Sequence, residues 1–414
     1  MLSVILSGLL AVALWTVAVL VLVPIFVLTV ECLAAVLPRR VQAPPGPADR
    51  RPRSAVVIPA HNEQAHLGAT LRSVIPQLGP ADRLIVVADN CDDQTARVAL
   101  SLGAEVMVRN DANHRGKGFA MDFAIRQLDQ DAPPVVVFTD ADCDLQEGAL
   151  DALVRQVAST GRPAQATYLL GRPADAALRD TVSTFAFLLK NEVRPTGLRR
   201  MGLPCQLHGA GMALPWDVIR KISLADGNIV EDLQLGLNLA SAGCAPLFCP
   251  AARVTGRLPS GTDAAITQRR RWEHGHLRTI FTQAPRLLKA ALTHRSFAPL
   301  VLALDVAVPP LSLLALAVIC ISPLIILAAW FGAPRLPAVL VGAGVVLGFV
   351  SLLAAWAGFA RRIVPFSTIL AAPFYIAWKV PMYVAFLVRP QRQWVRTPRA
   401  AVHLEPAAAT DRNR

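Results

Sequence analysis

A long hydrophobic run at the N-terminus limits what this chain can fold into. From Val4 to Leu37 the sequence is almost uninterrupted in apolar residues and carries one acid, Glu31. Because about 20 helical residues cross a bilayer, this run is long enough for a full membrane span. A cleavable signal peptide is the alternative, but it needs a basic start and a shorter apolar core. The run therefore predicts an N-terminal transmembrane helix over residues 1–37 that stays in the mature protein.

Hydrophobic sequence returns between residues 297 and 389. Runs at Leu300–Trp330 and Leu336–Ala360 predict two further spans. A third run, Ile363–Leu387, carries Lys379 and has arginines on both flanks. An interfacial helix would keep both flanks on one side of the membrane, and a fourth span is equally compatible with the pattern. The C-terminal membrane region is therefore expected to hold two or three helices.

Basic residues concentrate beside these hydrophobic runs. A Pro- and Arg-rich linker covers residues 38–53, and a basic tail that we expect to be disordered covers residues 390–414. Basic juxtamembrane segments favour the cytoplasmic face, which would leave the N-terminus outside. The net charge of +12 suits an anionic partner. A nucleic acid is not expected, because the arginines flank the membrane runs and the predicted strand ends are acidic.

The region between residues 54 and 293 has the composition of a globular α/β domain. Short β-branched runs that read as buried strands alternate with helical patterns. The expected strands are Ala55–Pro59, Leu84–Ala88, Glu105–Arg109 and Val135–Thr139, and the expected helices are Gln64–Gln77, Gln94–Gly103 and Gly118–Gln127. This alternation predicts a Rossmann-like, mostly parallel sheet, in which ligands bind outside the C-terminal ends of the strands.

Acidic residues gather just after three of these strands. Glu63 follows the first, Asp89 follows the second, and Asp140 and Asp142 follow the fourth. Turn and helix-cap chemistry explains any one cluster alone, but three neighbouring strand ends together predict a site. Asp140 and Asp142 can turn two carboxylates into one pocket, and such hard oxygen ligands suit Mg²⁺ or Mn²⁺ bridging to a diphosphate.

Two glycine-containing turns are further candidates. In His114–Gly118 the ammonium of Lys117 and the start of the following helix offer positive charge to phosphate oxygens. The same Gly-Lys-Gly sequence is also a common surface turn. The segment His208–Gly211 is either a loop that faces the acceptor or a structural turn.

The remaining candidates come later in the chain. Glu231 and Asp232 open a helical run, and a positioned carboxylate such as Asp232 can accept the proton of an attacking sugar hydroxyl. The alternative is an acid that only favours the helix dipole. Gln268, Arg271 and Trp272 share one helix face, where an aromatic ring suits stacking on a sugar. A basic interfacial helix is the other explanation of this segment, and both can hold.

Taken in order, these motifs resemble glycosyltransferase family 2, in its membrane-bound branch of cellulose, hyaluronan, poly-N-acetylglucosamine and ceramide-glucoside synthases. The resemblance rests on five segments: Pro59–Glu63, Ala88–Asn90, Asp140–Asp142, Glu231–Asp232 and Gln268–Trp272. It implies an α/β domain of GT-A fold, flanked by transmembrane helices. Two positions depart from the family pattern: Ala88 replaces a frequent Asp, and Val230 replaces a frequent Thr.

The resemblance also implies roles for individual residues. Asp89 matches the acid that binds uracil, and Asp140 and Asp142 match the pair that binds metal and nucleotide. Asp232 matches the general base. Three residues match the Gln-x-x-Arg-Trp element that holds diphosphate and acceptor: Gln268, Arg271 and Trp272. The donor site is then expected to include Glu63, Asp89, Lys117, Asp140 and Arg271.

Residues and resemblance together predict an inverting, metal-dependent glycosyltransferase that uses a UDP-sugar. The first hypothesis for the acceptor is a growing polysaccharide on the cytoplasmic face of a bacterial inner membrane, with a β-linked product. Three or four spans are few for an export pore, so this hypothesis requires a homodimer or an export partner. One alternative is a glycolipid synthase that adds a single sugar to a lipid. Another is a membrane-bound nucleotide-sugar binding module without turnover.

Overall fold

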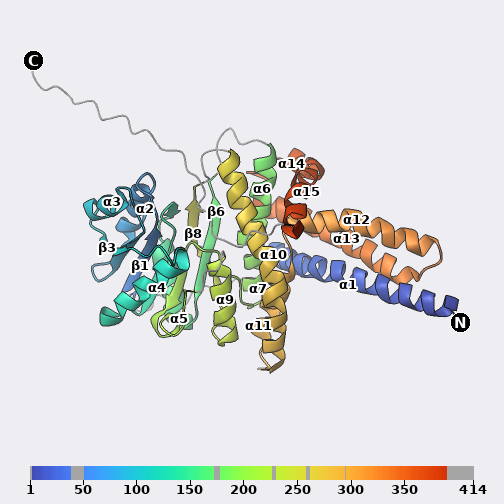
Figure 1. Ribbon diagram of the computed structural model, residues 1–414, viewed down its shortest axis with the longest axis horizontal. Helices are drawn as coiled ribbons and strands as arrows, with labels where there is room; N and C mark the ends of the chain where they lie inside the picture. Colours follow the sequence, from blue (N-terminus) through green and yellow to red (C-terminus); the bar gives the residue numbers. More distant parts are fainter. Residues whose placement is uncertain are drawn as a thin grey trace, which may run out of the picture.

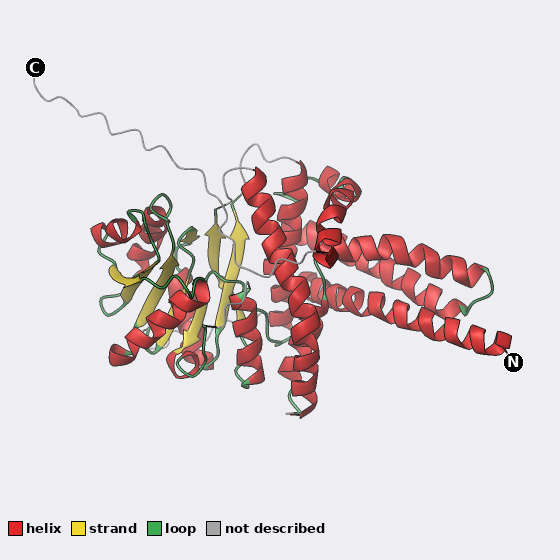
Figure 2. Ribbon diagram, in the orientation of Figure 1, coloured by secondary structure: helices red, strands yellow, loops and turns green. Residues whose placement is uncertain are grey.

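The computed structural model describes residues 2–38, 51–171, 178–225, 230–257, 262–293 and 295–388. It consists of an α/β domain and an arm of long helices that extends away from it (Figures 1 and 2). Most of the expected linker, from residue 39 to residue 50, and the expected tail lie outside the described residues.

Eight strands form one sheet in the described part of the α/β domain, in the order β3-β2-β1-β4-β7-β6-β8-β5. They are β1 (Ser54–Ala60), β2 (Arg83–Asp89), β3 (Glu105–Arg109), β4 (Val135–Phe138), β5 (Cys143–Leu145), β6 (Ala164–Leu170), β7 (Met212–Pro215) and β8 (Leu247–Gly256). The first four are the predicted strands, and they pair in parallel. The other half is mixed, because β7 runs antiparallel to β4 and β6, and β5 runs antiparallel to β8.

Helices cover both faces of this sheet. They are α2 (Leu67–Val74) with η1 (Ile75–Gln77), α3 (Thr95–Ser101), α4 (Lys117–Leu128) with η2 (Asp129–Asp131), α5 (Ala149–Thr160), α8 (Trp216–Ile219) and α9 (Glu231–Ser241). Side chains of β1 alternate between the faces, as the two-residue period of a strand requires. Val56 packs into a core with α2 and α5, and Val57 packs into a second core with α4, α8 and α9.

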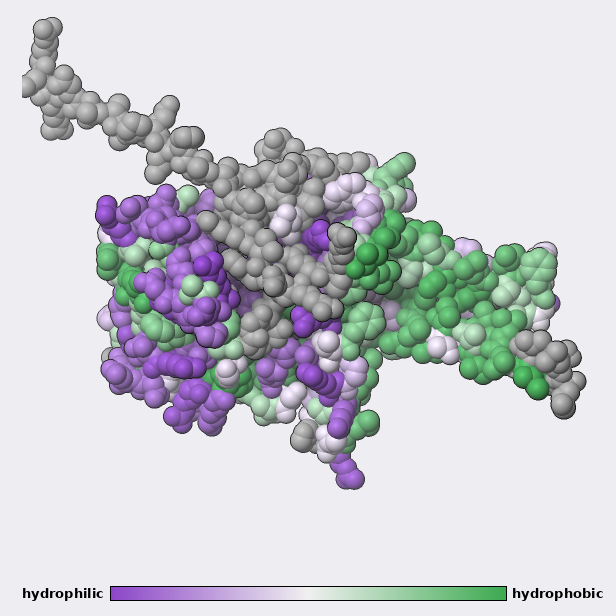
Figure 3. Space-filling view, in the orientation of Figure 1, coloured by the Kyte–Doolittle hydropathy of each residue, from purple (hydrophilic) through white to green (hydrophobic). Residues whose placement is uncertain are grey.

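The helical arm consists of α1 (Leu2–Val36), α12 (Leu311–Trp330) and α13 (Arg335–Ala355), which continues into η4 (Trp356–Ala360). In the described residues three helices are long and apolar enough to cross a membrane: Ser7–Val36, Leu311–Trp330 and Arg335–Ala360. Hydrophobic side chains dominate the visible surface of the arm (Figure 3). Leu20, Phe26 and Trp330 are among the exposed ones. An apolar surface of this extent suits contact with lipid.

Further helices fill the junction between the domain and the arm. They are α6 (Leu178–Leu188), η3 (Leu189–Val193), α7 (Arg194–Arg200), α10 (Thr262–Thr293), α11 (Phe297–Ala307), α14 (Phe366–Leu370) and α15 (Ala372–Val388). Helices α10 and α11 run across the direction of the arm (Figure 1). The ambiguous third run forms α14 and α15, and the 17 described residues of α15 make it shorter than the three candidate spans. Lys379 of α15 is buried in an ion pair with Glu273 of α10, so α15 packs on the junction.

A buried charge cluster ties α1 to this junction. Arg194 at the start of α7 donates to the Glu31 carboxylate, with Nε and Oε2 2.5 Å apart, and also pairs with Asp305 of α11. Gln206 donates to the second oxygen of Asp305 over 2.9 Å. A side chain at Gly197 would collide with the backbone of Glu31, so a glycine lets α7 and α1 approach closely. The single acid of the N-terminal run therefore has a structural partner.

Candidate active site

A cavity of about 550 Å³ lies at the C-terminal ends of β1, β2 and β4 and continues to the junction helices. The residues that the sequence analysis selected all line it: Glu63, Asp89, Lys117, Asp140, Asp142, Asp232, Gln268, Arg271 and Trp272. Asp89 is buried, and the others are partly exposed to this space. The fold thus brings together residues that lie up to about two hundred positions apart in the sequence.

The loops after β1 and β2 are shaped by two asparagines in the left-handed backbone region. Asn62 has φ 56° and Asn90 has φ 52°. Asparagine tolerates this conformation better than most side chains, which explains its place at these sharp turns. The Asn62 side chain bonds to Asp92 of the neighbouring loop and accepts from the Asp92 backbone N–H over 2.9 Å. The two strand ends are therefore held side by side.

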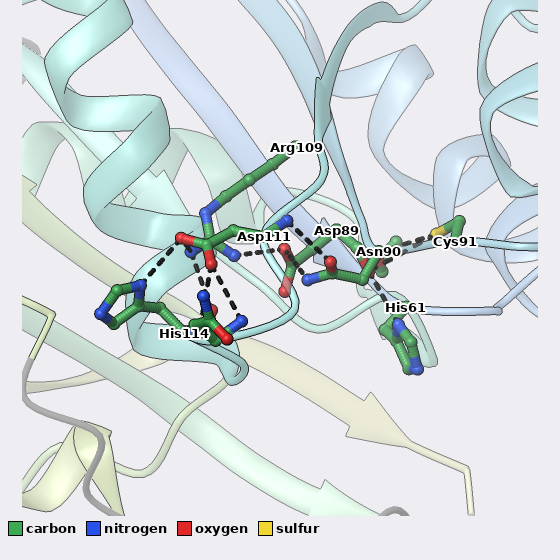
Figure 4. A network of polar contacts seen from close by, with 9 residues as sticks. His61, Asp89, Asn90, Cys91, Arg109, Asp111 and His114 are labelled. Carbon is green, nitrogen blue, oxygen red and sulfur yellow. Dashed lines mark hydrogen bonds and ion pairs between the residues drawn. The ribbon is translucent and has the colours of Figure 1, made fainter.

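Asp89 is held by a polar network at the end of β2 (Figure 4). Arg109, at the end of β3, pairs with Asp89 Oδ1 at 2.6 Å, and Asn90 Nδ2 donates to the same oxygen over 2.9 Å. His61 Nδ1 lies 2.7 Å from the Asp89 carbonyl oxygen. Desolvation raises the pKa of Asp89 against the opposing effect of Arg109. The sequence analysis did not select Arg109, whose contact depends on the pairing of β2 with β3.

The aspartates after β4 fit a divalent cation. The carboxylates of Asp140 and Asp142 and the thiol of Cys143 come within 4.8 Å of one another. Burial raises the pKa of the Cys143 thiol well above its usual range, and a soft thiol suits Mg²⁺ or Mn²⁺ less well than carboxylate oxygens do. Two carboxylates that reach one cavity are the donor set that Mg²⁺ or Mn²⁺ prefers. Asp140 and Asp142 are the residues that would hold the ion.

Lys117 begins α4 and forms an ion pair with Asp140. Its Nζ also donates to the Gly209 carbonyl over 2.9 Å. Burial lowers the pKa of Lys117, but the carboxylates of Asp140, Glu231 and Asp232 raise it more, so the group stays charged. Gly118 faces the Leu224 carbonyl, which a Cβ would approach to 2.4 Å. That glycine allows close packing of the protein itself, and Lys117 is what the turn presents to the cavity.

Glu231 and Asp232 stand in the first turn of α9, as predicted. Desolvation, followed by the neighbouring Asp232 carboxylate, raises the pKa of Glu231 to about 7. Desolvation also raises the pKa of Asp232, while Lys117 and Lys190 lower it. Gly209 has φ 89° and lies beside Asp232, whose Oδ2 would be 3.1 Å from a Cβ at that position. A side chain at position 209 would crowd the Asp232 carboxylate, which lines the cavity.

The predicted motif on α10 forms the next part of the wall. Trp272 packs on Phe187 of α6 with ring centroids 5.8 Å apart, and Phe187 packs on Tyr168 of β6 at 5.5 Å. Arg271 lines the cavity, and its Nε is buried without a hydrogen-bond partner among the described residues. A buried donor of this kind is commonly satisfied by a ligand or by water. Gln268 lines the same side.

Lys190 and Lys379, which the sequence analysis did not select, also reach the cavity, as does Arg194 of the junction. Lys190 comes from η3 and lies within electrostatic range of Asp232. Lys379 comes from α15, where it is the charged residue of an apolar helix. Lys190 and Lys379 each interrupt a hydrophobic stretch of the sequence, and this position could have marked them as candidates. Their partners lie far away in the sequence, so the pattern did not show which groups they meet.

The architecture and the site together define a class of protein. A mixed α/β sheet with carboxylates at its strand ends is the GT-A arrangement of nucleotide-sugar transferases. A mannosyltransferase from Pyrobaculum calidifontis, solved with GDP-Man and Mn²⁺, has a similar fold: the TM-score is 0.51 at 18% identity, over 89% of this chain and 99% of that one. The model of the family described as glycosyltransferase like family 2 matches residues 52–275. The chain belongs to this family.

Curated relatives match a shorter segment. A 4,4'-diaponeurosporenoate glycosyltransferase of Staphylococcus aureus (strain bovine RF122 / ET3-1) is 34% identical over 140 residues, which are 33% of this chain and 36% of that protein. The protein of the same name from strain USA300 is 38% identical over 104 residues, which are 24% of this chain and 27% of that protein. The matches thus span about a third of the length of these relatives.

Proposed function

We propose that this protein is a membrane-held, metal-dependent, inverting glycosyltransferase that moves one sugar from a UDP-sugar to a lipid acceptor. One observation carries the proposal: a single cavity joins the acidic cluster to apolar side chains at the base of the helical arm. The glycolipid alternative of the sequence analysis is therefore preferred to the growing polysaccharide. A lipid acceptor also needs no export pore, and hence neither a homodimer nor an export partner.

The donor end of the cavity is suited to a nucleoside diphosphate sugar. Asp89, held by Arg109, presents a fixed carboxylate that can accept hydrogen bonds from a uracil ring. Lys117 and Arg271 supply positive charge for the diphosphate. Mg²⁺ or Mn²⁺ on Asp140 and Asp142 would add charge neutralisation when bound. Glu63 lines the same end, beside the loop after β1.

Asp232 is our candidate for the general base. Where the acceptor group is a hydroxyl, the Asp232 carboxylate accepts its proton as the hydroxyl oxygen attacks the anomeric carbon. The bond from that carbon to the diphosphate oxygen breaks as the new bond forms, and the electron pair leaves with UDP. A single displacement inverts the anomeric centre, so an α-linked donor gives a β-linked product. Lys117 and Lys190 favour the ionised form of Asp232 that this step requires.

The other end of the cavity is suited to an apolar chain. Leu28 of α1, Leu311 of α12 and Trp378 of α15 line it, and all belong to helices of the arm or its junction. An acceptor held in the membrane can place its polar end at Asp232 while its tail stays with these side chains. The acceptor that names the curated relatives, 4,4'-diaponeurosporenoate, supports testing such compounds first.

We also propose that the α/β domain faces the cytoplasm of a bacterial cell membrane. Arg361 and Arg362 follow α13 at the domain end of the arm, and in the sequence the basic linker follows the end of α1. Positive residues favour the cytoplasmic side of a span. Labelling of single cysteines placed at Arg361 and at Gly332, in the turn between α12 and α13, tests this orientation. The turn should be labelled from outside the cell and the arginine position should not.

The activity test uses the purified protein in nanodiscs with Mn²⁺ and a panel of UDP-sugars. The acceptor probes are dioleoylglycerol, undecaprenyl phosphate and 4,4'-diaponeurosporenoate in the disc, and cellotetraose in solution. UDP release that depends on one lipid, with a product that carries one sugar, supports the proposal. A ladder of products from cellotetraose would instead favour the polysaccharide synthase. Binding of UDP without turnover on any probe would favour the binding module.

A further inference from the structure

The acceptor end of the cavity is closed by a set of contacts between α10 and α15 that no motif of the family suggests. They begin one residue after Trp272. Glu273 of α10 pairs with Lys379 of α15 and accepts a hydrogen bond from Tyr383 Oη over 2.8 Å. The next residue, His274, places Nε2 3.1 Å from the Met382 carbonyl oxygen. The stretch of α15 from Lys379 to Tyr383, a little over one helical turn, is thereby aligned with the segment that carries Trp272.

These contacts form a satisfied polar cluster in an apolar surrounding. The Lys379 and Glu273 side chains are 5% and 13% exposed. Ser312 of α12 lies 2.6 Å from the Tyr383 hydroxyl, so the cluster joins three helices. A buried ion pair adds little net stability compared with an apolar pair of the same shape, because desolvation of both charges offsets their attraction. Its effect is on geometry, since the alternative arrangements leave a charge unpaired.

The geometry that the cluster fixes is the wall of the cavity. Tyr375 and Trp378 lie on α15 within one turn of Lys379, and both line the cavity with Trp272. Lys379 Nζ lies 4.9 Å from the centre of the Tyr375 ring. The Tyr375 hydroxyl is buried and has no hydrogen-bond partner among the described residues. A polar group bound in the cavity would supply the hydrogen-bond partner that this hydroxyl lacks.

We propose that Glu273 and Lys379 are positioning residues for the acceptor: their pairing sets α15 so that the Tyr375 hydroxyl meets the acceptor's polar end opposite Trp272, while Trp378 packs on its tail. The inference rests on the proposed function, because it assigns this wall to the acceptor. The residues proposed for the uracil and the metal lie at the strand ends, and Arg271 is the proposed donor residue on α10, so the donor end should change less than the acceptor end. Changes at Glu273 or Lys379 should therefore affect the KM for the lipid acceptor more than the Kd for UDP.

The test compares Glu273→Gln with the exchanged pair Glu273→Lys/Lys379→Glu. We measure KM for the panel lipid that the wild-type enzyme glycosylates, and the Kd for UDP with Mn²⁺ by calorimetry. Glu273→Gln should raise the lipid KM about tenfold and leave the UDP Kd within twofold, because Lys379 loses its counter-charge next to Tyr375. The exchanged pair should recover most of the lipid KM. If the pair only stabilises the fold, Glu273→Gln should lower the melting temperature without raising the lipid KM relative to the UDP Kd.

Glu192→Gln is the matched control, because it breaks an ion pair of 2.7 Å with Arg253 that does not line the cavity. If Glu273→Gln fails to fold, Tyr383→Phe removes one hydroxyl from the cluster and should raise the lipid KM by a smaller factor. An unchanged lipid KM in a folded Glu273→Gln or Tyr383→Phe variant overturns the inference. Failure of the wild-type enzyme to glycosylate any lipid of the panel overturns the proposed function instead.

Discussion

Two charge clusters in this molecule share the same ingredients and differ in what surrounds them. At the junction, Arg194 lies between Glu31 and Asp305, and Gln206 donates to the second oxygen of Asp305. At the strand ends, Lys117 lies among Asp140, Glu231 and Asp232, and these groups line an open cavity. The carboxylates of the junction cluster do not line the cavity, although Arg194 and Gln206 do, and this cluster holds three helices together: α1, α7 and α11. The strand-end cluster keeps an excess of carboxylates that the described protein does not neutralise, which suits it to a cation and a proton.

The difference shows how a structural charge cluster can be told from a chemical one. Both clusters are desolvated, so burial alone does not separate them. What separates them is completeness: each carboxylate of the junction cluster accepts a hydrogen bond from Arg194. Glu231 and Asp232 of the strand-end cluster instead line the cavity, where a bound group can reach them, and desolvation raises the pKa of both. Groups with raised pKa values in a cavity are candidates for proton transfer.

The largest effect is expected from Asp232→Asn, which tests whether the strand-end cluster takes part in proton transfer. We expect loss of sugar transfer by about 10³-fold, because the amide cannot accept the acceptor's proton. The melting temperature and the Kd for UDP with Mn²⁺ should stay close to wild type. UDP release with the lipid acceptor, measured beside calorimetry, checks both. Glu231→Gln is the matched control and should cost much less; equal losses in the two variants would move the base away from Asp232.

The junction cluster should respond in the opposite manner. Arg194→Met leaves Glu31 and Asp305 buried without a cation, which costs about 3–5 kcal/mol of stability. We expect a marked drop in the melting temperature in detergent, with the UDP Kd of the folded fraction unchanged. Adding Glu31→Gln and Asp305→Asn should restore much of the stability. A melting temperature equal to wild type for Arg194→Met would show that the cluster does not tie α1 to the domain.

The contrast between the clusters also shows what the sequence could and could not predict. The four parallel strands and their terminal acids were predictable, because each lies in one continuous segment with its own pattern. Glu31 stood out as the one acid in an apolar run, but its partner Arg194 is 163 positions away. Arg109 and Lys190 reach the site through strand pairing and a π-helical turn, which local patterns do not encode. Long-range pairing is therefore what the structure adds.

A further test of the strand ends asks whether Asp142 binds a divalent cation. Asp142→Asn removes one of two proposed oxygen ligands, so Mn²⁺-dependent binding of UDP should weaken by about tenfold or more. Calorimetric titration of UDP with and without Mn²⁺ measures this. Asp144→Asn is the control, because Asp144 pairs with Arg257 over 2.5 Å and does not line the cavity. Equal Mn²⁺ dependence in both variants would remove Asp142 from the metal site.

The smallest effect that we expect concerns Lys190, and it tests whether the strand-end cluster is tuned for its chemistry. Desolvation raises the pKa of Asp232, and Lys117 and Lys190 oppose it. Removing one opposing charge with Lys190→Met should raise that pKa further. Sugar transfer requires the ionised carboxylate of Asp232. As the pH is lowered, Lys190→Met should therefore lose activity at a higher pH than the wild type does, and the two should differ little at high pH. The acidic limb of kcat/KM against pH measures the shift. Lys190→Arg keeps the positive charge, so its acidic limb of kcat/KM should match that of the wild type. If Lys190→Met also matched the wild type, Lys190 would not affect the pKa of Asp232.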